Sequence, residues 1–111
     1  MWQAAELLIG ALDPLIDRAR PVAANSASHL ERSGESVLFN TAEGIGAFQP
    51  KVKIVSYEVA KREANEVRAI LRRLDIRKIF TALEIKRAYD LAGAVIGMLT
   101  RAIIALQKRD A

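Results

Sequence analysis

The sequence predicts an all-α protein, an antiparallel up-down-up-down four-helix bundle that occupies residues 1–111 as a single domain. Two observations lead to this prediction. Apolar residues make up 51% of the 111-residue chain and are mainly Ala, Leu, Ile and Val, with only six aromatic residues, a composition that favours helices. Four long stretches also place apolar residues three and four positions apart, with short breaks between them, as in a helical bundle.

The first helix is predicted over residues 2–19, with a kink or a restart near Pro14. Asp13 is a good helix cap and Pro14 suits the first helical position, so the pair interrupts the pattern. The second helix is predicted over residues 23–46. Beside its core stripe runs a row of small or polar residues that allows close helix contact: Ser26, Ser33, Asn40 and Gly44. The predicted core stripe itself is Ala27, Leu30, Gly34, Val37, Leu38, Thr41 and Ile45.

The third helix is predicted over residues 51–75, where apolar residues alternate spacings of four and three, the pattern of a bundle seam. This seam consists of Ala60, Ala64, Val67, Leu71 and Leu74. The connection near residues 77–80 is short, which suits antiparallel neighbours.

The fourth helix, over residues 81–108, carries two apolar stripes. The first is Ala82, Ile85, Tyr89, Ala92, Ile96, Leu99, Ile103 and Leu106, and the second is Ala88, Leu91, Val95, Met98, Ala102 and Ala105. One bundle core requires a narrower apolar face than this. The helix is therefore either deeply central or in contact with other copies of the chain. We favour self-association, with an oligomer interface at Leu91, Val95, Met98 and Ala102.

Charge divides the chain into two unlike halves. Residues 1–50 hold three Lys or Arg against six Asp or Glu, a net −3, whereas residues 51–111 hold fourteen against seven, a net +7. Such polarity suits an anionic partner, or attraction between one half of a subunit and the other half of its neighbour. The candidate nucleic-acid-binding cations lie on and just after the third helix: Lys61, Arg62, Arg68, Arg72, Arg73, Arg77 and Lys78.

Several kinds of chemistry are excluded by composition. The chain has no cysteine and one histidine, His29, so it lacks the ligands of a di-metal bundle and the residues of a convincing catalytic triad. We expect no enzyme activity, no metal and no cofactor, and a partly exposed His29. The Gly44-x-Gly46 pair reads as a helix terminator and Gly93-x-x-x-Gly97 as a helix-packing motif.

We also expect a bacterial cytoplasmic protein without a targeting or membrane-spanning segment. Residues 1–12 lack the cationic start of a secretory signal. The longest uncharged run, residues 91–100, is about half of the roughly 20 residues needed to cross a bilayer.

Two acidic residues attract attention because of their positions. Glu43 precedes Gly44 at a helix end, where a carboxylate opposes the negative end of the helix dipole. By helical phase, Glu63 lies at the edge of an apolar stripe, where burial without a partner is costly. We expect arginine or backbone partners for both, in a structural role; a general acid–base role is the less favoured alternative.

The run Asn40-Thr41-Ala42-Glu43-Gly44 at the end of the second helix, with Arg32 and Ser36 before it, resembles the signature of the 23S rRNA intervening-sequence proteins. Downstream, Ala60 and Glu66 match that family's Ala-x-Gly-Ser-x-x-Glu pattern, with Arg62 and Glu63 in place of Gly-Ser. The family-motif residues are thus Asn40, Ala42, Glu43, Gly44 and Glu66.

This resemblance implies an antiparallel four-helix bundle that assembles into a homopentameric ring. Relatives of the family include the accessory variability determinant of diversity-generating retroelements, a basic pentamer that partners a reverse transcriptase and nucleic acid. Our first hypothesis is accordingly a homo-oligomeric module that contacts RNA or DNA through its third helix. The rival hypothesis is a scaffold that binds only its own copies or a protein such as a reverse transcriptase.

Overall fold

The computed structural model describes residues 1–110, and they form four α-helices joined by short connections. The helices are α1 (Trp2–Ala19), α2 (Ala24–Gly46), α3 (Pro50–Ile76) and α4 (Ala82–Asp110), and no strand occurs in these residues. The all-α prediction with four helices is therefore confirmed, and every helix begins and ends within two residues of its predicted bounds.

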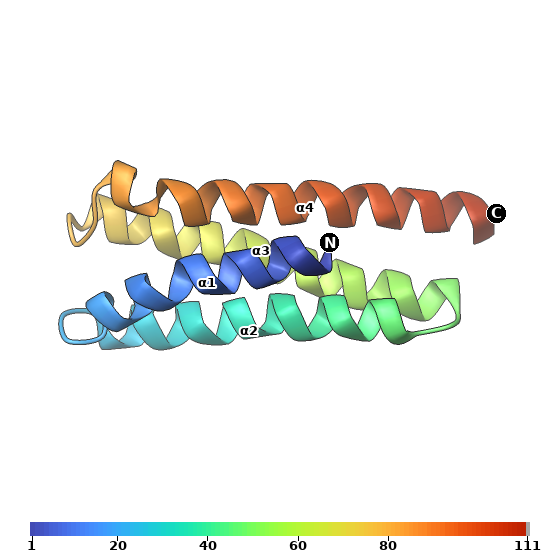
Figure 1. Cartoon of the computed structure of the whole chain (residues 1–111), viewed down its shortest axis with the longest axis horizontal. Coiled ribbons are helices and arrows are strands. Elements are labelled where there is room, and N and C mark those ends of the chain that lie inside the picture. The colour runs from blue at the N-terminus through green and yellow to red at the C-terminus, as the bar shows by residue number, and fades with distance from the viewer. Residues whose placement is uncertain (111) are drawn as a thin grey trace.

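The four helices lie side by side in a bundle that measures 48 × 19 × 19 Å. Each helix packs against two neighbours: α1 contacts α2 and α4, while α3 contacts α2 and α4. In Figure 1 the α1–α2 and α3–α4 connections lie at one end of the bundle and the α2–α3 connection lies at the other. This arrangement leaves each helix one face toward the common core and one outer groove with each neighbour.

The core is built from the apolar stripes that the spacing predicts. Val67, Leu71 and Leu74 of α3 are fully buried, as are Leu8 of α1 and Leu30 of α2. Burial of side chains of this size supplies about 1.5–3 kcal/mol each relative to exposure. These apolar stripes are therefore the main source of the bundle's stability.

Two residues assigned to core stripes are in fact exposed. Ile45 of α2 is exposed because its neighbour Gly44, and not Ile45, faces α3. Ala82 is exposed because it lies in the first turn of α4, at the end of the bundle. The α3 core also gains Tyr57 and Ile70, which the predicted seam omitted.

Helix α1 continues through Pro14 without interruption, so the predicted restart does not occur. Proline removes the bond from residue 14 to the carbonyl of residue 10. Both Gly10 and Pro14 are exposed, and water is therefore available to that carbonyl. The apolar face of the helix, with Leu12 and Leu15 buried on either side of the proline, is undisturbed.

Helix α1 is the shortest of the four, with 18 residues against 29 in α4. At 1.5 Å per residue it is about 27 Å long, against about 43 Å for α4, and in Figure 1 it lies alongside only part of that helix. The second apolar stripe of α4 is therefore buried near the start of the helix and exposed near its end. Ala88 and Val95 are buried, whereas Ala105 is exposed.

The α3–α4 connection is a complete helix-ending turn. The amide of Ile79 donates to the carbonyl of Leu74 (3.0 Å) and that of Lys78 donates to Asp75 (2.9 Å), which is the Schellman pattern. Lys78 occupies the left-handed position with φ 60°. Glycine normally takes this place because a Cβ is strained there.

Helix α4 begins with a capping box. The amide of Glu84 donates to Thr81 Oγ1 (3.1 Å) and the amide of Thr81 donates to Glu84 Oε1 (2.9 Å). The second carboxylate oxygen of Glu84 accepts a hydrogen bond from Arg18 at the end of α1. The guanidinium of Arg18 also lies over the ring of Phe80, 5.0 Å from its centroid. Together these contacts join α1 to the start of α4.

Candidate functional site

The predicted cations of α3 fall on two different sides of the helix. Arg68 and Arg72 face α4, where Arg72 lines a depression with Ile85 and Tyr89. Arg73 faces α2 and lines a depression with His29. By helical spacing Lys61 shares the ridge of Arg68 and Arg72, and Arg62 shares the ridge of Arg73. Arg77 and Lys78 lie in the turn after α3.

The side of α3 that faces α4 carries the more constrained arginine. The guanidinium carbon of Arg68 lies 4.0 Å from the ring centroid of Tyr89, a cation–π stack between α3 and α4. Arg68 Nε is buried and has no hydrogen-bond partner. The flat guanidinium also lies against Gly93, since a Cβ built on that glycine would be 3.6 Å from its Cζ. Arg68 is therefore held in the groove between the two helices.

The glycine pair of α4 lies under two arginine side chains, one from α3 and one from α4 itself. Within 4 Å of a Cβ built on Gly93 the nearest atoms all belong to the Arg68 guanidinium, and at Gly97 both belong to the Arg101 guanidinium, the closer at 3.3 Å. Gly93 therefore permits a close contact with α3, as the predicted packing role requires, whereas Gly97 has no atom of another helix within 4 Å of its built Cβ. The glycines provide a strip without side chains on which two guanidinium groups lie.

Some charged side chains near this groove form ion pairs, but Arg68 and Arg101 do not. Lys86 Nζ lies 2.7 Å from Asp90 Oδ2, and Arg72 lies 3.9 Å from Asp75. Across residues 1–109, whose side chains the structure describes, neither Arg68 nor Arg101 makes a side-chain hydrogen bond or an ion pair with N···O within 4.0 Å. The groove between α3 and α4 therefore carries uncompensated positive charge.

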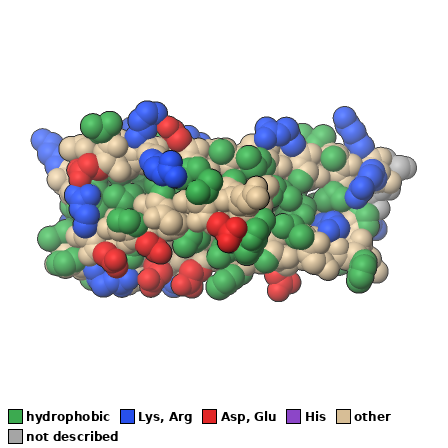
Figure 2. Space-filling model, viewed as in Figure 1, with side chains coloured by type: hydrophobic (Ala, Val, Ile, Leu, Met, Phe, Trp, Pro, Cys, Tyr) green, Lys and Arg blue, Asp and Glu red, His purple; other side chains and the backbone are tan. Residues whose placement is uncertain are grey.

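At the scale of the whole subunit, the two signs of charge separate. In Figure 2, Asp and Glu gather mainly along the edge formed by α2, while Lys and Arg lie along α4 and at the ends of the bundle. This agrees with the net −3 of residues 1–50 and the net +7 of residues 51–111. The separation produces a positive potential over the α3–α4 half.

The Asn40–Gly44 run closes α2 against α3. Gly44 is buried under the ring of Tyr57. Lys53 Nζ donates to the carbonyls of Gly44 (2.9 Å) and Ile45 (3.1 Å) and so caps the end of α2. Asn40 donates to the Ser36 carbonyl (2.9 Å) in its own helix, and Ala42 is exposed. Gly44 thus has a packing role.

The acidic residues have other surroundings than the sequence predicts. Glu43 is exposed and Glu63 is half-buried, and neither has a hydrogen-bond or ion-pair partner among the side chains that the structure describes. The expected partners are therefore lacking within the subunit, where helical phase leaves both carboxylates in reach of water. Glu66 Oε2 does have a partner, His29 Nε2 of α2, at 2.9 Å. His29 is exposed, as predicted.

The predicted oligomer-interface residues of α4 are not equally accessible. Val95 is buried inside the subunit, 2% exposed, so its assignment to an outer surface is wrong. Leu91, Met98 and Ala102 are half-buried at the edge of the core.

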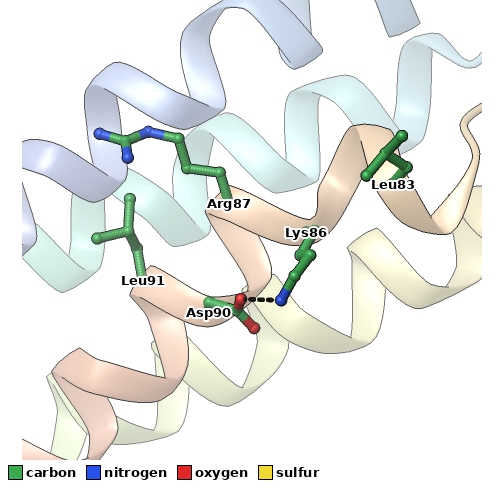
Figure 3. A pocket seen from close by; sticks show the side chains of 5 residues that line it. All are labelled: Leu83, Lys86, Arg87, Asp90 and Leu91. Atoms are coloured by element: carbon green, nitrogen blue, oxygen red, sulfur yellow. Dashed lines mark hydrogen bonds and ion pairs between the residues drawn. The ribbon is translucent and has the colours of Figure 1, made fainter.

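An open depression of about 520 Å³ adjoins Leu91. In Figure 3, Arg87 and Leu91 point toward α1, while Lys86 and Asp90 point away from it and bind each other. Leu83, at the other end of the depression, is 81% exposed. This side of α4 therefore presents apolar surface next to unpaired and paired charge.

The composition of α4 gives it one further property. By length and composition alone, a stretch within Ala82–Arg109 would suffice to cross a membrane, and 28% of that stretch is buried in the subunit. A core helix of a bundle passes the same test, and Ile85, Ala92 and Leu99 are buried against the other helices. No group of three or more potential metal-ligating side chains occurs in the described part of the chain.

Some contacts lay beyond sequence reasoning because they join different helices. The Arg68–Tyr89 stack, the Gly44–Tyr57 packing and the His29–Glu66 pair have no periodic signal. Arg101, by contrast, follows Gly97 by four residues, and that spacing places its side chain beside the glycine. The sequence could therefore have added Arg101 to the candidate cations.

The structure thus defines a small helical-bundle protein with a basic groove and without an evident catalytic centre in its described residues. The model of the 23S rRNA-intervening sequence protein family matches residues 2–101. The chain belongs to this family. Comparisons with curated proteins and with solved structures found no match.

Proposed function

We propose that the protein is a non-enzymatic binding module of the bacterial cytoplasm that assembles from identical copies and associates with RNA or DNA through cations of α3 and α4. The observation that carries this proposal is the separation of charge, net −3 in residues 1–50 and net +7 in residues 51–111, with cations along α4 in Figure 2. A positive surface of this kind attracts the phosphate backbone without regard to base sequence.

Assembly is the second part of the proposal. The alternating ends of the helix connections in Figure 1 support an antiparallel up-down-up-down order. The half-buried Leu91, Met98 and Ala102, in a helix stretch of which 28% is buried, support a contact between copies. The family resemblance favours a homopentameric ring. Each added copy repeats the same cations, so one nucleic-acid strand would be held by several weak contacts at once.

Two measurements test the proposal. Light scattering at micromolar concentration should give a mass several times the 12.2 kDa of one chain, and a monomer mass would reject assembly. Titration of labelled RNA, single-stranded DNA and duplex DNA at two salt concentrations should show binding that weakens as salt rises. Equal affinity at both salt concentrations, or absence of binding, would reject phosphate recognition.

A second candidate function is a scaffold whose partner is a protein, such as a reverse transcriptase. It is favoured by the exposed apolar side chains of α4, of which Leu83 is 81% and Ile104 46% exposed. Charge reversal at Arg72 and Arg73 separates the two candidates. Loss of assembly without a change in nucleic-acid binding would favour the scaffold, and loss of nucleic-acid binding with assembly intact would favour the first function.

A further inference from the structure

The outer groove between α3 and α4 combines features found together nowhere else on the described surface. One wall is the α3 ridge with Arg68 and Arg72, and the other is the α4 ridge with Tyr89 and Arg101. Between the aromatic ring and Arg101 lie Gly93 and Gly97, which have no side chains to fill the groove. The absence of side chains at these two positions lets the guanidinium groups of Arg68 and Arg101 lie close to the backbone of α4.

Arg68 is fixed before any ligand arrives. Its guanidinium is stacked on Tyr89 at 4.0 Å and lies flat against Gly93, which limits the rotation of a long side chain. A charged group that is already oriented loses less entropy when it binds.

Arg101 supplies a second guanidinium on the same strip. Its nearest nitrogen lies 3.3 Å from a Cβ built on Gly97. Gly93 and Gly97 are four residues apart, about 6 Å along the helix axis. The backbone positions on which the two guanidinium groups lie are therefore about one helical turn apart, a spacing that allows contact with one phosphate or with two neighbouring ones.

The alternative occupant, a helix of another protein copy, fits this groove less well. A helix packed on the glycine strip would bury both guanidinium groups against apolar side chains, and neither has a carboxylate partner in the described chain. Burial of an unpaired charge is strongly unfavourable. A phosphodiester instead offers oxygen acceptors that match the planar fork of arginine.

We propose that Arg68 and Arg101, laid over the bare Gly93–Gly97 strip and oriented on one side by Tyr89, form a binding site for the phosphodiester backbone of a nucleic acid. This inference rests on the proposed nucleic-acid function and assigns it to one groove. Arg68 and Arg101 contact the phosphates, and Tyr89 is a positioning residue that holds the planar guanidinium of Arg68 in one orientation.

The test is fluorescence anisotropy with labelled single-stranded RNA of about 20 nucleotides, enough to cover several binding sites, and with DNA of the same length, single-stranded and duplex. The variant Arg68→Gln/Arg101→Gln should bind at least about tenfold more weakly, because it loses two charge-assisted contacts. Its dependence of log K on log salt should become shallower by roughly 1.4 for a single strand. The control is Arg87→Gln, which removes one positive charge on the side of α4 that faces α1 and is matched in charge to the single variant Arg101→Gln. It should change affinity less than about twofold.

Tyr89 is tested by a pair of variants. Tyr89→Phe keeps an aromatic face and should retain affinity, whereas Tyr89→Leu removes the stack and should weaken binding about threefold with the salt dependence unchanged. A purely structural role of Tyr89 would instead lower thermal stability and leave affinity unmoved. If Arg68→Gln fails to fold by circular dichroism, Arg101→Gln alone is decisive, since Arg101 is exposed.

The outcomes separate the inference from the proposed function. If the wild-type protein binds none of the nucleic acids, the proposed function fails and the site falls with it. If the wild-type protein binds but the double variant binds equally well, or Arg87→Gln weakens binding as much, this site is overturned and the function stands. If the double variant keeps its affinity but changes its mass in light scattering, the groove is an interface between copies.

Discussion

The ring of Tyr57 lies over Gly44 in the space that any side chain at position 44 would need. A Cβ built on Gly44 would lie 2.6 Å from Tyr57 Cδ1. This distance is too short for two carbon atoms that are not bonded, so the ring or the helix would have to shift. The glycine of the family motif is therefore required by packing between α2 and α3, where the tyrosine is 4% exposed.

We predict that Gly44→Ala destabilises the protein by about 1–3 kcal/mol, because an overpacked core shifts the ring or the helix. Denaturant unfolding followed by circular dichroism measures this loss. Gly46→Ala is the control, since nothing lies within 4 Å of a Cβ built there. The double variant Gly44→Ala/Tyr57→Leu should recover part of the loss, and no recovery would show that the clash has another origin.

Lys78 offers a stabilising substitution. Because it holds φ 60° in the turn after α3, Lys78→Gly removes the strain of a Cβ in the left-handed region and should stabilise the protein by about 0.5–1 kcal/mol. The midpoint of thermal unfolding measures the gain. Arg77→Gly at the preceding residue, with φ −76°, should instead destabilise. A lower midpoint for Lys78→Gly would contradict the assigned turn.

Alkaline pH should weaken the protein through Tyr57. Burial raises the pKa of its phenol above the usual value of 10.0, so the folded state favours the neutral form. This contribution to stability is complete below the pKa of an unfolded tyrosine and is lost as the pH rises through the folded pKa. Denaturant unfolding at a series of pH values above 9 or so should show a steeper decline for the wild type than for Tyr57→Phe. Tyr89→Phe serves as the control at the half-buried tyrosine.

Acid pH should lower the stability of the folded protein through protonation of Glu84. The hydrogen bond from Arg18, followed by that from the Thr81 amide, lowers the pKa of its carboxyl below the usual 4.5. The stabilisation is therefore present above that value and is lost as the pH falls through the lowered pKa. Glu84→Gln should lower the unfolding midpoint at neutral pH and make the acid-side decline shallower. Glu6→Gln is the matched change of charge, because Glu6 of α1 is exposed and makes no ion pair with a side chain of residues 1–109. Equal effects of the two variants would refute the assigned contact.

Substitutions along one stripe of α4 should affect either folding stability or assembly, according to whether the residue is buried in the subunit. Val95→Ala removes two buried methyl groups and should cost about 1–3 kcal/mol of stability with little effect on mass. Ala102→Glu places a charge on half-buried surface and should reduce the mass in light scattering while the subunit keeps its helical content. If Ala102→Glu assembles like the wild type, the interface between copies lies elsewhere.

The sequence was sufficient for the helices because their apolar spacings are local and regular. The seam from Ala60 to Leu74 is buried throughout, and Pro50 opens α3 as its position indicates. The errors have local causes: Ile45 was assigned inward although Gly44 takes the contact, and Pro14 was expected to restart a helix whose apolar face in fact continues past it.

The candidate site was less predictable, because its geometry depends on how the helices are rotated against one another. Seven cations of similar appearance along α3 and its exit were assigned together, yet Arg68 and Arg73 face different neighbours. Nothing in the sequence distinguishes an arginine stacked on a tyrosine of the next helix from one in water. The outward assignment of Val95 is wrong for the same reason, since only the packed structure shows that this side chain is buried.

The contact between α1 and α4 is the one pairing of helices that are not consecutive in the chain. Consecutive helices can form hairpins with short loops, which close quickly, whereas joining the first helix to the last requires the chain between them to be arranged first. We therefore expect the Arg18–Glu84 contact to form late in folding, so that its removal accelerates unfolding in stopped-flow kinetics while the rate of refolding stays nearly the same.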